Sequence, residues 1–214
     1  MTGNKKIPAA GLYCITGEEF SRGRSNAAVV REVIAAGIEI IQYREKEKLP
    51  LYKYRECLEI REMTASAGVT FIVNDDIALA LAVGADGVHI GQEDLPIERV
   101  RELVGDEMII GLSTHSPAQA REAEAKGADY IGVGPLFRTY TKKDVCEPVG
   151  LAYLDFVVAN GSLPFVAIGG IKEHNIGEVA RRGARLICAV TEILAADDIG
   201  QAIASLEDKI AASP

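Results

Sequence analysis

Short runs of apolar residues alternate with longer amphipathic stretches along the 214 residues of the chain. The short runs are rich in Val and Ile, and the longer stretches repeat their apolar residues with the period of a helix and often end at glycine. This alternation predicts eight strand-helix units. The predicted strands span residues 12–16, 38–44, 71–74, 87–91, 109–114, 130–136, 164–170 and 186–191, and the predicted helices span residues 25–37, 51–68, 76–84, 95–105, 117–127, 151–161, 175–183 and 198–210.

Strands that are apolar on both faces are typical of a parallel sheet covered by helices. Eight units in succession indicate an α/β fold of the closed (β/α)8 TIM barrel type. A doubly wound open sheet is the alternative, because periodicity does not show whether a sheet closes. No linker or low-complexity segment divides the chain, so we expect one domain over residues 1–214, with an irregular N-terminal segment over residues 1–10.

Composition limits the partners of this protein. A formal net charge of −8 and an isoelectric point near 5.0 argue against nonspecific binding to nucleic acid or to an anionic membrane. The four cysteines lie far apart in sequence, which predicts reduced thiols, and neither a secretory signal nor a membrane span is indicated. We expect a cytoplasmic protein that acts on small molecules. Its oligomeric state stays open, with a homo-oligomer among the alternatives.

Polar residues directly after the second predicted strand form the first candidate site, because barrel active sites lie at the carboxyl ends of the strands. Gln42, Arg44 and Lys46 occupy alternating positions, so an extended chain would point them to the same side. One amide donor and two cations would then converge on an anion. A solvent-exposed run of charges explains the same pattern equally well.

Carboxylates follow the third and fourth predicted strands. Asn74, Asp75 and Asp76 come directly after an apolar run, and we expect one of the two aspartates to cap the next helix. Asp94, with Glu93 as a weaker candidate, lies on the neighbouring loop. Two carboxylates from adjacent loops, without a suitable His or Cys cluster, suggest Mg²⁺, which binds through one or two carboxylates and substrate phosphate.

The three histidines differ in their expected roles. His115 follows Ser113 and Thr114 after the fifth predicted strand, and a hydrogen-bonding or packing role is favoured there over acid-base chemistry, since the sequence positions no partner for it. We expect His89, inside an apolar run, to lie in the barrel interior. His174 is expected on a helix surface.

The sixth, seventh and eighth predicted strands are followed by residues that suit phosphate. The loop over residues 132–144 combines hydroxyls and cations behind a Gly-Pro turn, and the last two strands of such barrels often carry phosphate sites built from backbone N–H groups. The candidate residues are Thr139, Thr141, Lys142, Gly170 and Thr191, with Arg138 and Lys143 less favoured. Two anion sites in one barrel mouth suggest two phosphorylated substrates.

Taken together, these segments resemble the thiamine phosphate synthase family. The motifs are "QYREK", "NDD", "HIGQED", "STH", "GPLFRTYTKKD", "AIGGI" and "AVT", and the resemblance covers nearly the whole chain from about residue 12 onward. It implies a (β/α)8 barrel enzyme that joins a pyrimidine methyl diphosphate to a thiazole phosphate with Mg²⁺. The products would be thiamine phosphate and pyrophosphate.

The same resemblance implies three groups of site residues. Those of the diphosphate site are Gln42, Tyr43, Arg44, Glu45, Lys46, Asn74, Ser113 and Lys142, of which Arg44, Lys46, Ser113 and Lys142 would act in catalysis; Asp75 and Asp94 match the Mg²⁺ ligands; Thr139, Tyr140, Thr141, Gly170, Val190 and Thr191 match the thiazole phosphate site. One departure is visible, since the family more often has Ser-Ala where this chain has Thr191 and Glu192. A carboxylate there would repel a phosphate unless it points away.

Three alternatives belong to other functional classes. A thiazole tautomerase-like isomerase shares the barrel but does not keep the diphosphate and metal residues as a set, whereas this chain has all of them. A noncatalytic thiamine phosphate-binding protein would need the thiazole site and not the carboxylates. A sugar-phosphate isomerase would leave "QYREK" and "TKKD" without a role.

Overall fold

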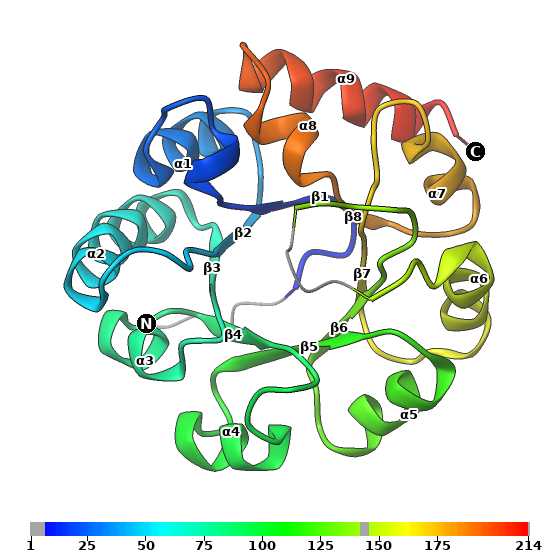
Figure 1. Cartoon of the computed structure of the whole chain (residues 1–214), viewed down its shortest axis with the longest axis horizontal. Helices are drawn as coiled ribbons and strands as arrows, with labels where there is room; N and C mark the ends of the chain where they lie inside the picture. The colour runs from blue at the N-terminus through cyan, green and yellow to red at the C-terminus, as the bar shows by residue number, and fades with distance from the viewer. Residues whose placement is uncertain (1–6, 142–145, 214) are drawn as a thin grey trace.

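The computed structural model describes residues 7–141 and 146–213, which form a ring of parallel strands enclosed by helices (Figure 1). The elements are β1 (Gly11–Ile15), η1 (Glu18–Phe20), α1 (Asn26–Ala35), β2 (Ile40–Tyr43), α2 (Pro50–Ala67), β3 (Thr70–Asn74), α3 (Ile77–Val83), β4 (Gly87–Ile90), α4 (Ile97–Val104), β5 (Ile109–Thr114), α5 (Pro117–Ala125), β6 (Tyr130–Val133), α6 (Gly150–Asn160), β7 (Phe165–Ile168), α7 (Ile176–Arg181), β8 (Leu186–Cys188), α8 (Val190–Leu194) and α9 (Ile199–Ala211). Each strand pairs with the next, and β8 pairs with β1. The predicted closed barrel is confirmed, and the open sheet is wrong.

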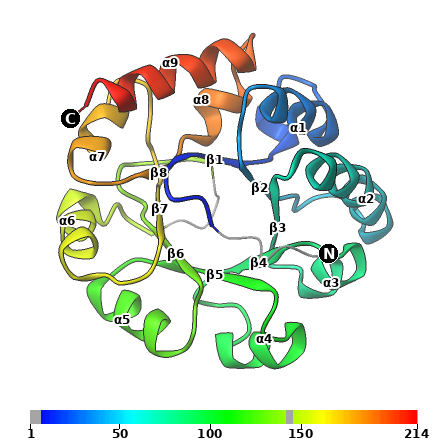
Figure 2. The ribbon, with the colours of Figure 1, turned by 180° about the vertical axis from the view of Figure 1, so that it is seen from behind.

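The barrel has a core on each side of its sheet, because side chains alternate along every strand. Tyr13, Ile40 and Ile72 fill the interior of the ring, while Ile41 and Val73 pack outward against the helices. Figure 2 shows the helices surrounding the strands from the opposite side, and both views place α9 beside α1 and α7. Strands buried on both faces explain the continuous apolar runs of the sequence.

The register brings the carboxyl ends of neighbouring strands to one rim of the ring. Asn74 at the end of β3 lies beside His89 on β4, and Ser113 near the end of β5 lies beside Gly132 on β6. Polar residues that are far apart in the sequence therefore meet at the mouth of the barrel. The helices lie on the outside of the ring, so this rim carries the loops that lead from each strand into the next helix.

Several predicted strands are longer than those in the structure, and β6 and β8 show two physical reasons. β6 ends at Val133 and not at residue 136, because Pro135 has no N–H to donate to a strand ladder. β8 ends at Cys188, and the next residues form the short helix α8. A short apolar run is compatible with either strand or helix, so the sequence pattern did not distinguish them.

The state of the cysteines agrees with the prediction of reduced thiols. All four cysteines are free, and three of them, Cys14, Cys57 and Cys188, are buried. Burial raises the pKa of Cys14 to about 12, so its thiol stays protonated and unreactive. Within residues 7–141 and 146–213, no helix has both the length and the apolar character that crossing a bilayer requires.

Candidate active site

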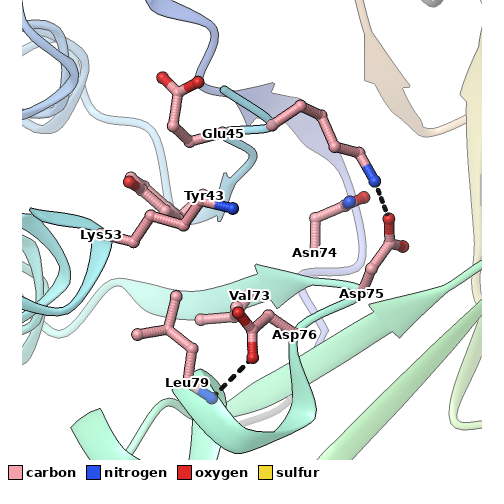
Figure 3. A pocket seen from close by; sticks show the side chains of 9 residues that line it. Tyr43, Glu45, Lys53, Val73, Asn74, Asp75, Asp76 and Leu79 are labelled. Carbon is pink, nitrogen blue, oxygen red and sulfur yellow. Dashed lines mark hydrogen bonds and ion pairs between the residues drawn. The ribbon is translucent and has the colours of Figure 1, made fainter. Parts of the chain in front are cut away.

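A pocket of about 150 Å³ opens between the loops that follow β2 and β3 (Figure 3). Its walls combine carboxylates and cations with the ends of two buried strands. The lining residues are Tyr43, Glu45, Lys46, Lys53, Val73, Asn74, Asp75, Asp76 and Leu79. The pocket therefore includes several residues that the sequence places in an anion site.

Asp75 and Asp76 point in different directions, as Figure 3 shows. Asp76 caps α3, since its Oδ1 accepts a hydrogen bond of 2.9 Å from the backbone N–H of Leu79. Asp75 has a left-handed backbone, with φ of 60°, and its carboxylate forms an ion pair with Lys46. The prediction that one aspartate caps the helix is confirmed, and the other carboxylate faces the pocket.

Asp94 lies close to Asp75, although the two come from different loops. Its Oδ2 accepts a hydrogen bond of 2.6 Å from the N–H of Gly91. Desolvation and the nearby carboxylate of Asp75 raise the pKa of Asp94, and the Gly91 hydrogen bond only partly opposes them. Two carboxylates that repel each other are a site that a cation would stabilise. In the described part of the chain, no group of three or more His, Cys, Asp or Glu side chains could hold a metal ion.

The three cations after β2 have different partners. Lys48 is tied to Glu18 and Glu56, with N–O distances of 2.7 and 2.9 Å, and Lys46 is paired with Asp75. The backbone N–H of Arg44 donates to Thr16 Oγ1 at 2.9 Å, but its guanidinium has no ion-pair partner among residues 7–141 and 146–213. An arginine without a counterion is unusual in so acidic a protein, and it is available to an anionic ligand.

Tyr43 and Glu45 are held by residues of the surrounding helices. The Tyr43 hydroxyl donates to Glu56 Oε2 at 2.7 Å, and burial together with this carboxylate raises the pKa of the phenol. Asn26 donates to both Glu45 and Glu56, at 3.3 and 3.1 Å. These contacts anchor the start of the loop after β2, and a direct contact of either side chain with substrate stays a prediction.

A chain of hydrogen bonds crosses the barrel interior below the mouth. Gln42 Nε2 donates to the hydroxyl of Tyr13 at 2.8 Å, and the hydroxyls of Tyr13 and Tyr130 are 2.8 Å apart. The Tyr130 hydroxyl lies 2.9 Å from His89 Nδ1, and His89 Nε2 lies 3.0 Å from Ser113 Oγ. The interior position predicted for His89 is confirmed. Burial raises the pKa of both phenols, so the chain consists of neutral hydroxyls.

Gly111 leaves the space that the rings of Tyr130 and His89 occupy in this hydrogen-bond chain. A Cβ atom at Gly111 would lie 2.2 Å from Cζ of Tyr130 and 2.4 Å from Nδ1 of His89, so no other residue fits there without displacing a ring. Gln42, expected at the mouth beside Arg44 and Lys46, is instead buried and donates inward to Tyr13, because the side chain finds its hydrogen-bond partner inside the barrel. Neither Tyr13 nor Tyr130 was among the predicted site residues. Their signal in the sequence is a tyrosine at an inward position of an apolar strand, where its hydroxyl must find a buried partner.

Hydroxyl groups dominate the opposite side of the mouth. Thr139 Oγ1 and Thr141 Oγ1 are 3.2 Å apart, and the backbone N–H of Thr141 is 3.4 Å from Thr139 Oγ1. Tyr140 is 82% exposed, so nothing in the described chain covers it. Lys142 and Lys143, which the sequence places in the same loop, lie outside the described residues.

The glycines after β7 allow two loops to touch. Gly170 has φ of +66°, and a Cβ atom there would lie 2.5 Å from the backbone oxygen of Arg138. Gly169 O accepts a hydrogen bond of 2.9 Å from the N–H of Phe137. The loop after β6 is therefore seated on the loop after β7, which gives Gly170 a packing role whether or not it also contacts phosphate.

Val190 and Thr191 belong to the first turn of α8 and not to a strand. The ammonium of Lys172 donates to Thr191 Oγ1 and to Glu192 Oε1, the latter at 3.0 Å, and Glu192 Oε2 accepts from the N–H of Glu173 at 3.0 Å. Burial alone would raise the pKa of Glu192, but the Glu173 N–H and Lys172 outweigh it and lower the pKa. The negative charge of Glu192 is thus neutralised locally. No spacing pattern in the sequence linked Lys172 to these residues.

His115 has a hydrogen-bonding role, as the sequence favoured. Its Nδ1 lies 2.6 Å from the carbonyl oxygen of Gly134, and its backbone N–H donates to Gln119 Oε1 at 2.7 Å. These bonds connect the end of β5 to the start of the loop after β6. His174, by contrast, is exposed in the turn before α7 and not on the helix itself, where the sequence predicted it.

This closed barrel has at its mouth an arginine without an ion pair among the described residues, a carboxylate pair and a hydroxyl-lined loop, which are features of barrels that bind phosphorylated small molecules. The comparisons with known proteins narrow this class. The model of the family described as thiamine monophosphate synthase matches residues 12–193, and the chain belongs to this family.

Curated relatives are similar over almost their whole length. A thiamine-phosphate synthase of Pelotomaculum thermopropionicum is 68% identical over 197 residues, which cover 92% of this chain and 90% of that protein. A thiamine-phosphate synthase of Lawsonia intracellularis is 54% identical over 201 residues, or 94% of this chain and 93% of that one. Among solved structures, a thiamine phosphate pyrophosphorylase from Pyrococcus furiosus is 35% identical with a TM-score of 0.86, covering 96% of this chain and 97% of that chain.

Proposed function

We propose that this protein is an enzyme that joins 4-amino-2-methyl-5-(diphosphooxymethyl)pyrimidine to 4-methyl-5-(2-phosphoethyl)thiazole and releases pyrophosphate. The carboxylated form of this thiazole would serve in the same way, with its carboxyl group leaving as CO2. The observation that carries the proposal is the 68% identity over 92% of the chain to a relative named thiamine-phosphate synthase. The two chemically distinct sides of the mouth support it, because the reaction needs a place for a diphosphate and another for a monophosphate.

The diphosphate would bind on the side of β2, β3 and β4. Arg44 has no counterion among residues 7–141 and 146–213, and its planar guanidinium can hold two phosphate oxygens at once. Lys46 forms an ion pair with Asp75 in the same site, and its ammonium group can exchange this carboxylate for a phosphate oxygen. Asn74 and Ser113 would supply neutral donors, and Lys142 a further charge.

Asp75 and Asp94 suit Mg²⁺, because both offer hard oxygen ligands and because desolvation, together with repulsion from Asp75, raises the pKa of Asp94. When bound, Mg²⁺ would supply positive charge to the departing diphosphate. The carboxylates would hold the ion at the edge of the site, and substrate oxygens would complete its ligands. Lys46 competes with Mg²⁺ for the Asp75 carboxylate, so the ion pair between Lys46 and Asp75 would have to break when Mg²⁺ binds.

The thiazole phosphate would bind on the side of β6, β7 and β8. Thr139, Thr141 and Thr191 offer hydroxyls, and Gly170 brings two loops together there. Glu192 does not oppose this role, since Lys172 and the Glu173 N–H neutralise its charge. Tyr140 and the backbone of Val190 would complete the walls.

The reaction needs no protein nucleophile. The thiazole nitrogen gives its electron pair to the pyrimidine methylene, the bond from this carbon to the diphosphate oxygen breaks, and pyrophosphate leaves with the bonding electrons. The pyrimidine ring can share the positive charge that develops on the methylene. The residues of this chain would therefore act by positioning both substrates and by stabilising the charge of the leaving group.

The test is to mix purified protein with both substrates and Mg²⁺ and to measure thiamine phosphate and pyrophosphate. Formation of both in equal amounts supports the synthase. A folded protein that binds thiamine phosphate without turnover would support a noncatalytic binding protein, and isomerisation of the thiazole alone would support a tautomerase-like enzyme. Either result would overturn the proposal.

A further inference from the structure

The hydrogen-bond chain below the mouth has a direction that its chemistry dictates. Gln42 Nε2 can only donate, so the Tyr13 oxygen accepts at this end. Tyr13 then has one proton and, in the described chain, one other partner for it, the hydroxyl of Tyr130 at 2.8 Å. A buried hydroxyl proton without an acceptor is costly, so Tyr13 donates to Tyr130.

The donors and acceptors from Tyr130 to Ser113 can be assigned in the same way. Tyr130 has accepted from Tyr13, so its own proton is directed to His89 Nδ1 at 2.9 Å. A neutral imidazole that accepts at Nδ1 carries its proton on Nε2. This proton faces Ser113 Oγ at 3.0 Å, so the serine oxygen accepts and the serine proton remains for another partner. A protonated ring would instead place two donors against each other at Tyr130.

We propose that His89 is a positioning residue for Ser113: the chain that runs from Gln42 through Tyr13 and Tyr130 holds His89 in one tautomer, and His89 thereby directs the Ser113 proton toward the barrel mouth. The inference rests on the proposed function, because the acceptor of this proton would be an oxygen of the diphosphate. A hydroxyl that is fixed as a donor binds an anion better than one that is free to rotate, since no reorientation is needed at the moment of reaction. His89 acts through Ser113 and need not touch the substrate.

His115 provides an internal comparison, because its ring carries the proton on the other nitrogen. Its Nδ1 lies 2.6 Å from the carbonyl oxygen of Gly134, which can only accept, so the neutral ring of His115 must carry its proton on Nδ1. The structure thus assigns opposite tautomers to His89 and His115. With three histidines in the whole chain, each can be resolved individually in a spectrum of histidine-labelled protein.

The first test is ¹⁵N NMR of the full-length protein labelled at histidine, near neutral pH. We expect the Nε2–H form at His89 and the Nδ1–H form at His115, with His89→Gln and His115→Gln used to assign the signals. Tyr130→Phe removes the donor to Nδ1 and should give a mixture of tautomers at His89. Tyr153→Phe removes another buried hydroxyl, which donates to Thr114 Oγ1 at 2.7 Å outside this chain, and should leave His89 unchanged. An Nδ1–H or doubly protonated His89 in the unmodified protein would overturn the proposal.

The second test measures binding of inorganic pyrophosphate with Mg²⁺ by calorimetry, so it does not depend on turnover. His89→Phe and Ser113→Ala should each weaken binding about ten-fold, the loss expected for one hydrogen bond to a charged group. His89→Gln keeps a donor for Ser113 and should recover most of the affinity. The double variant of His89→Phe and Ser113→Ala should bind like Ser113→Ala alone. Losses that multiply, with no recovery by glutamine, would overturn the proposal and assign His89 a separate role.

The two tests separate this inference from the proposed function. If no thiamine phosphate forms but the tautomers and the pyrophosphate affinities are as expected, the synthase activity is wrong and the positioning role stands. If the synthase is active but His89 has the other tautomer, only the positioning role fails.

Discussion

The side of the barrel mouth formed after β2, β3 and β4 differs in its chemistry from the side formed after β6, β7 and β8. The first contains ionised groups in close contact, including the ion pair of Lys46 and Asp75 and the nearby carboxylate of Asp94. The second is lined by threonine hydroxyls and glycines, and the carboxylate of Glu192 on this side is neutralised by Lys172. We therefore expect ligand binding on the first side to depend on charge, and ligand binding on the second side to depend on hydrogen bonds and on the fit between two loops.

This difference matters because a leaving group and a second substrate make different demands. A departing diphosphate gains charge in the transition state, so cations and a metal ion accelerate its loss. The phosphate of the thiazole does not change its charge in the reaction, so neutral donors suffice to hold it. Substitutions on the first side should therefore reduce turnover, and substitutions on the second should reduce affinity for one substrate.

The strongest test of this contrast is the carboxylate pair. Asp75→Asn and Asp94→Asn should each lower kcat/KM by about three orders of magnitude, because each weakens a metal site that supports the leaving group. Raising the Mg²⁺ concentration should restore part of the activity, and the double variant should cost far less than the product of the single losses. Steady-state kinetics across a Mg²⁺ titration would measure both effects.

Asp155→Asn is the matched control for the carboxylates, since Asp155 pairs with Arg182 on the outer helices. It should leave kcat/KM unchanged. Multiplicative losses at Asp75 and Asp94 without Mg²⁺ rescue would remove both from the metal site and weaken the contrast between the two sides.

Arg44→Gln should lower kcat/KM for the diphosphate by about two orders of magnitude, because a charge donor to the leaving group is lost. The KM for the thiazole phosphate should change little. Arg99→Gln, which breaks only a surface pair with Glu102 at 2.7 Å, is the control and should be silent. An equal effect of Arg44→Gln on both substrates would mean that Arg44 acts through the loop and not on the diphosphate.

Thr191→Val should raise the KM for the thiazole phosphate about ten-fold and leave kcat nearly unchanged, because it removes one neutral donor. Valine keeps the shape of threonine, so the first turn of α8 should be preserved. Separate KM measurements for the two substrates decide the matter. A larger effect on kcat than on this KM would place Thr191 in catalysis and contradict the expectation that this side of the mouth contributes only to affinity.

Glu192→Gln should have the smallest effect, a modest loss of stability that depends on pH. The pKa of Glu192 is lowered from its usual 4.5 in the folded state, so its charge stabilises the fold above that value. This contribution is lost as the pH falls through the lower pKa of the folded protein. Unfolding in urea at several pH values should show a difference from the unmodified protein that is largest near neutral pH and disappears in acid. A difference independent of pH would show that Glu192 acts by packing and not by charge.

Local patterns in the sequence were sufficient for the elements and for some of their ends. The alternation of apolar runs and amphipathic stretches predicts the eight strand-helix units, because it reflects side chains that alternate in a strand or follow the turn of a helix. Asp76 caps α3 through an atom only three residues away, so a pattern in the sequence is enough to predict it. The end of β8 was not predictable in this way, since the residues from Val190 to Leu194 suit a strand and a helix equally.

The sequence by itself determined the eight strand-helix units and placed most candidate residues directly after strands, where a parallel sheet gathers them at one edge. The closure of the sheet was established by the pairing of β8 with β1. Only the tertiary structure decided what each side chain contacts at the mouth of the barrel. It directs the Gln42 amide inward to the Tyr13 hydroxyl and pairs Lys172 with Thr191 and Glu192. It also links five strands through the hydrogen bonds that join Gln42, Tyr13, Tyr130, His89 and Ser113. These contacts link residues from 19 to 117 positions apart, and they depend on rotamers and on a space such as that above Gly111, which no local pattern encodes.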